Sequence, residues 1–249
     1  MNLKCFGGKV VLRGLSLLGV LALLACFVIF SSSAASAAPP SFGFARIIHA
    51  APSAGNVDVF VDGMKLPASI AFGTVTAYAP VPAGAHRIQI APAGKGAGAA
   101  MIDRTVTIAP QTAYTLAALG TTATGFSLNT FVDNNLLVGG GNMAKMRVYH
   151  LSPDAGPINL TTGGKTVIAG LAYPDASDYL TMPAGTPTFS AAATQSGTRV
   201  AVPATLQPGT VTSIFAIGLL NGTPALQFVT ATVPAVPARA MQAEPVGHV

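Results

Sequence analysis

The chain has 249 residues and a net charge of +5; 51% of its residues are hydrophobic and only 8% are charged. Its charges are sparse: it has 13 basic and 8 acidic residues in all. Three of the basic residues lie before position 14, so the rest of the chain is nearly neutral. There is no basic cluster and no tryptophan, so the sequence lacks the electrostatic footprint of a nucleic-acid-binding protein, and no nucleic-acid partner is expected.

The N-terminus has the three regions of a secretory signal peptide. A basic start is followed by an uncharged, mostly apolar run over 14–30 and by a small, polar stretch over 31–38. The tripeptide that ends at Ala37 fits an A-x-A cleavage site. Residues 1–37 are therefore predicted to be a signal peptide cleaved after Ala37, which places the protein outside the cytoplasm, either secreted or in the cell envelope.

Two alternatives would leave the chain anchored to a membrane. The run 14–30 is at the short end of what can span a bilayer, so an uncleaved anchor is one of them. The other is lipidation of Cys26, because Leu23-Leu24-Ala25-Cys26 is similar to a bacterial lipobox. Membrane contact is expected only through this segment. Both cysteines, Cys5 and Cys26, lie in the signal segment 1–37, so a cleaved chain would contain no disulfide.

After residue 40 the chain is punctuated by glycine and proline and is typical of short strands. Val57, Val59 and Val61 alternate with residues that are polar except for Phe60. This pattern predicts a row of core-facing valines with Asp58 and Asp62 toward water. The predicted strands of this half are 44–51, 56–62, 73–80, 85–91, 100–108, 112–119 and 126–132. Those of the second half are 145–151, 157–161, 166–170, 176–181, 186–193, 198–206, 211–218 and 225–232.

The two halves are copies of one another. The segment from Arg46 to Gly55 returns as Arg147 to Gly156, and the match continues to Leu119-Gly120 and Ile217-Gly218. A unit of about 100 residues is a domain, because solenoid repeats are shorter.

The spacing of the short strands predicts an all-β fold with two tandem immunoglobulin-like β-sandwich domains, preceded by an N-terminal hydrophobic signal segment. The predicted organisation is a signal peptide at 1–37, a spacer at 38–43, the first sandwich at 44–133, a Gly-rich linker at 134–144, the second sandwich at 145–232 and a disordered Pro/Ala-rich tail at 233–249.

The segment Arg46-Ile47-Ile48-His49-Ala50-Ala51-Pro52, followed by Val57 to Gly63 and by Val81-Pro82-Ala83-Gly84, resembles a bacterial exported domain, the domain-of-unknown-function family 4397 (DUF4397). The resemblance covers 44 to about 133 and is weaker from 145 to about 232. It implies a β-sandwich, often in tandem, on exported or envelope proteins, and it transfers no catalytic residues.

His49 and His150 occupy equivalent places before a proline turn, and two interpretations are open. Each could be a ligand or a base, or each imidazole could bind the backbone and fix the turn. The second is favoured, because the single histidine of each proline turn is too few for a metal site without carboxylate help. Asp58, Asp62 and Asp103 could supply oxygens to calcium, but they lack the loop spacing and are expected to be solvent-facing strand acids. The candidate binding residues are thus His49, Asp58, Asp62 and His150; no catalytic residue, metal site or cofactor is predicted.

No G-x-S-x-G or H-E-x-x-H motif occurs in the sequence. The expected function is therefore that of an exported, non-catalytic binding, adhesion or structural module of the cell surface or envelope, whose partner is a surface ligand or an envelope component of unknown identity. The alternative is an exported hydrolase with a site near His49 in the first domain. That alternative requires a carboxylate within hydrogen-bond reach of His49, in an open cleft.

Overall fold

The computed structural model of the chain describes residues 41–136 and 141–235. Four parts of the chain lie outside the described residues: the predicted signal peptide with Cys26 and the cleavage site at Ala37, the first half of the spacer, the centre of the linker, and the tail from 236 onward. Across 41–136 and 141–235, no helix is long and apolar enough to cross a membrane.

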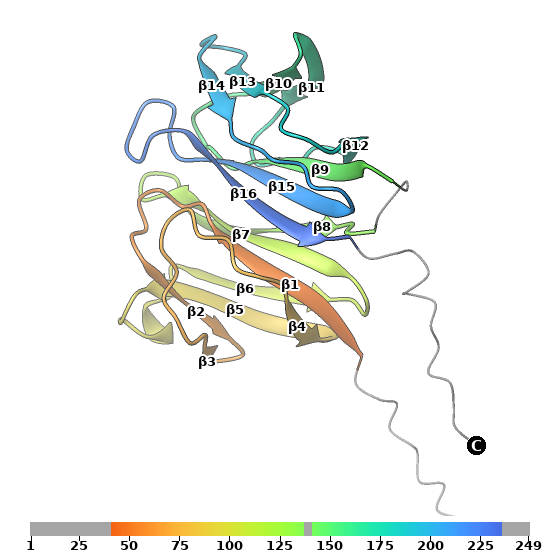
Figure 1. The fold of residues 1–249 in the computed structure, drawn as a ribbon. Coiled ribbons are helices and arrows are strands. Elements are labelled where there is room, and N and C mark those ends of the chain that lie inside the picture. Colours follow the sequence, from red (N-terminus) through yellow and green to blue (C-terminus); the bar gives the residue numbers. More distant parts are fainter. Residues whose placement is uncertain (1–40, 137–140, 236–249) are drawn as a thin grey trace, which may run out of the picture. The chain divides into compact units, whose positions relative to one another are not determined.

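The first repeat is a sandwich of two four-stranded sheets (Figure 1). The sheet β4-β1-β7-β8 is built from Ala79–Pro82, Phe42–His49, Ala113–Thr121 and Gly125–Asp133. The sheet β3-β2-β5-β6 is built from Met64–Lys65, Val57–Val61, Gly84–Pro92 and Ile102–Ile108, and the short 3₁₀ helix η1 (Ala97–Ala99) connects β5 to β6.

The second repeat follows the same plan. Its sheet β12-β9-β15-β16 is built from Leu180–Pro183, Met143–His150, Thr210–Ile217 and Gln227–Pro234, and its sheet β11-β10-β13-β14 from Lys165–Leu171, Ile158–Thr162, Phe189–Ala193 and Arg199–Val202. In both repeats the first strand pairs in parallel with the seventh-position strand, β1 with β7 and β9 with β15. The prediction of an all-β chain with two tandem sandwiches is confirmed.

Each repeat has an apolar core between its own two sheets. In the first, Val57 and Val59 of β2 are buried with Leu116 of β7, as the alternation predicted. In the second, Leu160 of β10 and Ile214 of β15 are buried in the equivalent core. Burying side chains of this size contributes about 1.5–3 kcal/mol each, which accounts for sandwiches held together without covalent links.

A third apolar cluster joins the two repeats. Ile48 of β1 and Leu119 of β7 pack in one cluster with Tyr149 of β9 and with Phe215 and Ile217 of β15, and all five are fully buried. The two inner sheets are therefore covered on both faces, by the outer sheet of their own repeat and by the other repeat, as the layers of Figure 1 show. This is why β7 and β15 are buried along nearly their whole length: neither of their faces meets water.

Four of the predicted strands are wrong in extent: 73–80, 176–181, 186–193 and 198–206. In the second repeat β12 begins only at Leu180 and β13 only at Phe189. The segment 73–80 was expected as a strand, but it runs beside β1 through single contacts such as Thr76 N–H to the carbonyl of Ile47 at 2.9 Å, and regular pairing starts only at β4. The segment 198–206 was expected to be continuous, but β14 ends at Val202, immediately before Pro203.

Candidate functional site

Both candidate histidines are buried against the backbone of their own turns. His49 Nε2 donates to the carbonyl of Gly55 at 2.7 Å, and Nδ1 accepts from the amide of Ala51 at 3.4 Å. His150 bonds in the same way to the Gly156 carbonyl, at 2.7 Å. Burial lowers the pKa of both imidazoles, and the bond to the carbonyl only partly opposes this. The turn-fixing interpretation accounts for both residues, and His49 meets no carboxylate among the described residues.

Asp58 corrects the prediction that both strand aspartates face water. Its side chain is 1% exposed, beneath Lys65, whose Nζ lies 2.8 Å from Oδ2. The Ser69 hydroxyl donates to Oδ1 at 2.6 Å and the Gly94 amide to Oδ2 at 2.9 Å. These bonds, the one from Lys65 first, lower the pKa of Asp58 to about 2. The carboxylate therefore ties two loops to β2, because all of its partners come from outside that strand.

The second repeat keeps this tie without the charge. Asn159 stands where the first repeat has Asp58, and its Oδ1 accepts from the amide of Gly170 at 2.7 Å. A neutral amide can thus do the work of the carboxylate, which favours a structural role for Asp58 over a ligand-binding one.

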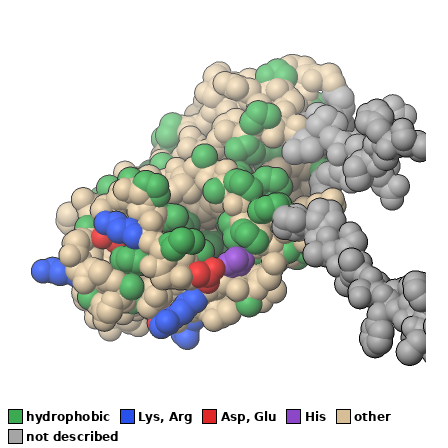
Figure 2. Space-filling model, turned by 90° about the horizontal axis from the view of Figure 1, so that it is seen from below, with side chains coloured by type: hydrophobic (Ala, Val, Ile, Leu, Met, Phe, Trp, Pro, Cys, Tyr) green, Lys and Arg blue, Asp and Glu red, His purple; other side chains and the backbone are tan. Residues whose placement is uncertain are grey.

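Asp62 belongs to a charged surface network on the outer face of the sheet β3-β2-β5-β6. Its carboxylate accepts from His86 Nδ1 at 2.7 Å and from the Arg87 amide at 2.8 Å. Arg87 in turn forms a bidentate pair with Asp103 on β6. The bond from His86 lowers the pKa of Asp62, and the same bond raises the pKa of His86. Figure 2 shows charged side chains on this side of the molecule, among a mostly neutral surface.

The junction of the two repeats encloses a charged cluster that the sequence did not predict. Asp133, at the end of β8, is fully buried and accepts hydrogen bonds from the hydroxyls of Tyr78 and Thr115, at 2.7 and 2.5 Å, and from the hydroxyl of Tyr149 in the second repeat. Arg46 Nη2 lies 3.9 Å from this carboxylate. One carboxylate therefore links the first repeat to the second.

The arginines at equivalent places in the two repeats complete this cluster. Arg46 donates to the hydroxyls of Thr115 at 2.8 Å and of Ser213, in the other repeat, at 2.7 Å. Arg147 donates to the carbonyl of Val132 at 2.8 Å and lies 3.5 Å from Asp133. In the described part of the chain every buried side-chain nitrogen and oxygen has a hydrogen-bond partner, so the cluster is satisfied internally.

A cavity of about 890 Å³ lies beside this cluster at the junction. Phe44, Tyr78, Leu136 and Val233 give it mostly apolar walls. Burial raises the pKa of Tyr78, so the phenol stays protonated and keeps donating to Asp133. The two charged residues that line the cavity, Arg46 and Asp133, are thus engaged in bonds that join the repeats.

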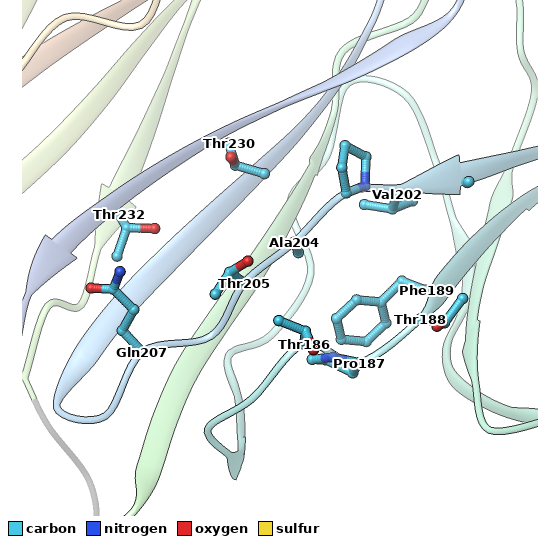
Figure 3. A pocket seen from close by; sticks show the side chains of 12 residues that line it. Thr186, Pro187, Thr188, Phe189, Val202, Ala204, Thr205, Gln207, Thr230 and Thr232 are labelled. Atoms are coloured by element: carbon cyan, nitrogen blue, oxygen red, sulfur yellow. The ribbon is translucent and has the colours of Figure 1, made fainter.

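A groove of different character lies in the second repeat, between the end of β14 and the edge strand β16 (Figure 3). Its volume is about 710 Å³, and its lining is neutral throughout. Thr230 and Thr232 line one side and Thr186 and Thr188 the opposite side, as Figure 3 shows. The remaining lining residues are Pro187, Phe189, Ala201, Val202, Pro203, Ala204, Thr205 and Gln207.

Most polar side chains of this groove are free. Among residues 41–136 and 141–235, no hydrogen bond engages the side chains of Thr186, Thr188, Thr205 or Thr230, and only Thr232 is bonded, to Thr212 at 3.1 Å. A threonine hydroxyl can donate and accept at the same time, so the groove offers hydrogen bonds in both directions. The residue types that predict catalysis or metal binding gave no signal here, because the groove contains none of them.

The described residues hold no group of three or more histidine, cysteine, aspartate or glutamate side chains placed to bind a metal ion. The four candidate residues are also not brought together: His49, His150 and Asp58 serve separate turns and loops, and Asp62 lies on the outer surface. Of the polar features described above, the neutral groove is the one whose side chains are free to meet a ligand.

Comparison with known proteins gives a family and little more. The profile described as "Domain of unknown function (DUF4397)" matches the chain twice, over residues 43–161 and 144–243. No curated protein matches the sequence.

Two solved structures are distantly similar. "The Bacillus anthracis TIE protein" is 10% identical, with a TM-score of 0.23, over 79% of this chain and 32% of that one. "The fimbrial anchor protein Mfa2 from Porphyromonas gingivalis" is 10% identical, with a TM-score of 0.19, over 78% of this chain and 100% of that one. The chain spans about a third of the length of the first protein. At these TM-scores neither structure informs the function of this chain.

Proposed function

Because this chain belongs to the DUF4397 family, in two tandem copies, we propose that it is an exported, non-catalytic module of the bacterial cell surface or envelope that binds a ligand through the neutral groove of its second repeat. The observation that carries the proposal is that the buried ionisable side chains are engaged in internal bonds whereas the hydroxyls of the groove are free. The buried ionisable side chains hold turns, loops and the junction, whereas the free hydroxyls lie in the groove.

Export is supported by the sequence of the N-terminus. The basic start, the apolar run over 14–30 and the A-x-A site ending at Ala37 have the order of a signal peptide. The low charge of the remaining chain and its lack of cysteine suit a secreted or envelope protein that needs no redox chemistry. A membrane-anchored form, through an uncleaved 14–30 segment or an acylated Cys26, is the alternative.

The hydrolase alternative near His49 receives no support from the site. A general base needs an open position and a partner that orients it. Both ring nitrogens of His49 are instead bonded to backbone groups of its own turn, and the residue is 0% exposed. Burial also lowers its pKa, and no reacting group could approach the ring without unfolding the turn.

The proposal is tested by expressing the full-length chain in a bacterial host and fractionating the cells. We expect the protein in the culture medium or envelope, with an N-terminus at Ala38 by intact mass spectrometry. A mass that retains residues 1–37, or one that carries acyl chains on Cys26, would identify the anchored alternatives. Accumulation of the intact chain in the cytoplasm, or turnover of ester, amide or glycoside substrates by the purified protein, would contradict the proposal.

A further inference from the structure

The groove of the second repeat exists because one strand ladder is interrupted. Gly185 and Leu206 exchange two backbone bonds of 2.8 Å, and pairing resumes at Phe189 and Val202 in the same register. The residues between these pairs, 186–188 on one side and 203–205 on the other, are unpaired. They include the groove residues that face each other in Figure 3.

A proline explains the interruption. Bonded pairs alternate along an antiparallel ladder, so the next bonded pair after Gly185 and Leu206 would be Pro187 and Ala204. Proline has no N–H, so it cannot donate to the carbonyl of Ala204. Among the described residues, neither that carbonyl nor the Ala204 amide has a backbone partner. The gap therefore leaves backbone donors and acceptors unpaired beside the free threonine hydroxyls.

The first repeat shows that the gap is particular to the second. The equivalent ladder runs without interruption from Gly84 opposite Ile108 to Ile90 opposite Ile102. His86 stands in the place of Pro187, and it pairs with Val106. The same ladder is therefore continuous where the residue is histidine and interrupted where it is proline, and the two repeats differ in structure at the groove.

We infer that this groove binds a neutral saccharide chain, an inference that rests on the binding function proposed above and names its ligand class. The lining carries no charge that would select an ionic ligand. Its hydroxyls and unpaired backbone groups can donate and accept, as saccharide hydroxyls do, while Pro187 and Pro203 offer apolar surface to C–H groups. An open groove suits a section of a chain rather than an enclosed small molecule.

A peptide strand inserted into the gap is one competing occupant, and the length of the gap argues against it. A peptide paired with the edge strand β16 is the other, and the peptide probe below tests for it. Three unpaired residues on each side span about 10 Å, whereas strands usually have about 5–6 residues. A peptide would gain few ladder bonds before it met the paired segments at Gly185 and Phe189.

The test compares the wild-type full chain with two double variants. Thr205→Val/Thr230→Val removes two free hydroxyls from the groove with little change of shape. Thr107→Val/Thr130→Val makes the same changes at the equivalent, exposed places of the first repeat and is the matched control. The probes are an array of neutral oligosaccharides, soluble dextran and mannan, the anionic polysaccharide alginate and a threonine-valine peptide.

We expect the wild type and the control to bind at least one neutral saccharide, and the groove variant to bind it roughly tenfold more weakly or not at all. Binding to alginate or to the peptide alone, no binding to any probe, or neutral-saccharide binding that the groove variant retains would each overturn the inference. The location of the chain and its N-terminal mass test export, and substrate turnover tests the non-catalytic assignment. A failure of either is therefore distinguishable from a failure of saccharide binding.

Discussion

Asp133, at the end of the last strand of the first repeat (β8), accepts a hydrogen bond from the hydroxyl of Tyr149, on the first strand of the second repeat (β9). With Arg46 and Arg147 beside it, this carboxylate joins the repeats from within. We expect Asp133→Ala to lower the free energy of unfolding by about 3–5 kcal/mol, because it leaves Arg46 and Arg147 without their counter-charge and three hydroxyls without their acceptor. Urea denaturation measures the effect.

The matched control for Asp133 is Asp178→Ala at an exposed position, with an expected change within about 0.5 kcal/mol. The shared apolar cluster also predicts that both repeats of the wild type unfold in one transition. Two separate transitions in a calorimetric scan, or an Asp133→Ala variant as stable as the control, would show that the junction is dispensable.

Asp58 should make stability depend on pH below 4. Its pKa of about 2 in the folded chain lies below the ordinary value near 3.9, so the unfolded chain binds the proton first. The stabilisation is fully present above about pH 4 and is lost as the pH falls through about 2. We expect Asp58→Asn to fold, since Asn159 serves the second repeat, and to lose less stability than the wild type over this range. Parallel slopes in acid denaturation would refute the assignment.

Val59→Asp should unfold the first repeat. Val59 is fully buried between the sheets, so the change forfeits about 1.5–3 kcal/mol of burial and places an unpaired charge in the core. Asp58→Val, which a water-facing Asp58 would tolerate, is also expected to destabilise the chain, because Lys65, Ser69 and Gly94 lose their acceptor. Melting temperatures followed by circular dichroism check both variants, and a mild Asp58→Val would restore the water-facing assignment.

His49→Ala should cost about 1–3 kcal/mol, because the buried Gly55 carbonyl loses its donor. Burial lowers the pKa of His49, so its folded form resists a proton that the unfolded chain accepts below about pH 6.5. Wild-type stability should therefore fall as the pH drops below that value, and less steeply in the variant. His86→Ala is the contrasting variant: the bond to Asp62 raises the pKa of His86, so its contribution to stability is present at low pH and is lost as the pH rises. An equally stable His49→Ala would remove the turn-fixing role.

Pro187→Val should close the groove. The new N–H can donate to the Ala204 carbonyl, as the uninterrupted ladder of the first repeat indicates. Net stability should change little, since the added bond is offset by the greater freedom of the unfolded chain. Hydrogen exchange is the sharper measurement: the Ala204 amide should become protected, and saccharide binding should be lost. Unchanged exchange at Ala204 would mean that the proline does not cause the gap.

Much of the fold could be predicted from the sequence, because it depends on local signals. The alternation of Val57 and Val59, the turn residues and the internal repeat predict strands, their faces and two sandwiches. The segment 73–80 was mispredicted because its contacts with β1 are single bridges, which leave no periodic pattern.

The site could be predicted only in part, because it depends on distant partners. Asp58 was expected in water, since Ser69 and Gly94 reach it from loops that no strand pattern locates. The junction escaped prediction for the same reason, although Arg46 and Arg147, charged residues at the same place in two apolar strands, were a signal for it. The groove depends on the missing backbone N–H of Pro187, and its effect can be recognised only when the register of the strand pairing is known.

The apolar faces of β1 and β7 also bear on synthesis, because a ribosome makes the first repeat before the second. Until β9 and β15 have been made, Ile48 and Leu119 are not covered by the second repeat. The exposed apolar surface makes the nascent first repeat prone to aggregation. A chain that stops short of Ile217 cannot shield that surface, so a truncated product aggregates or is degraded rather than persisting as a smaller version of the protein.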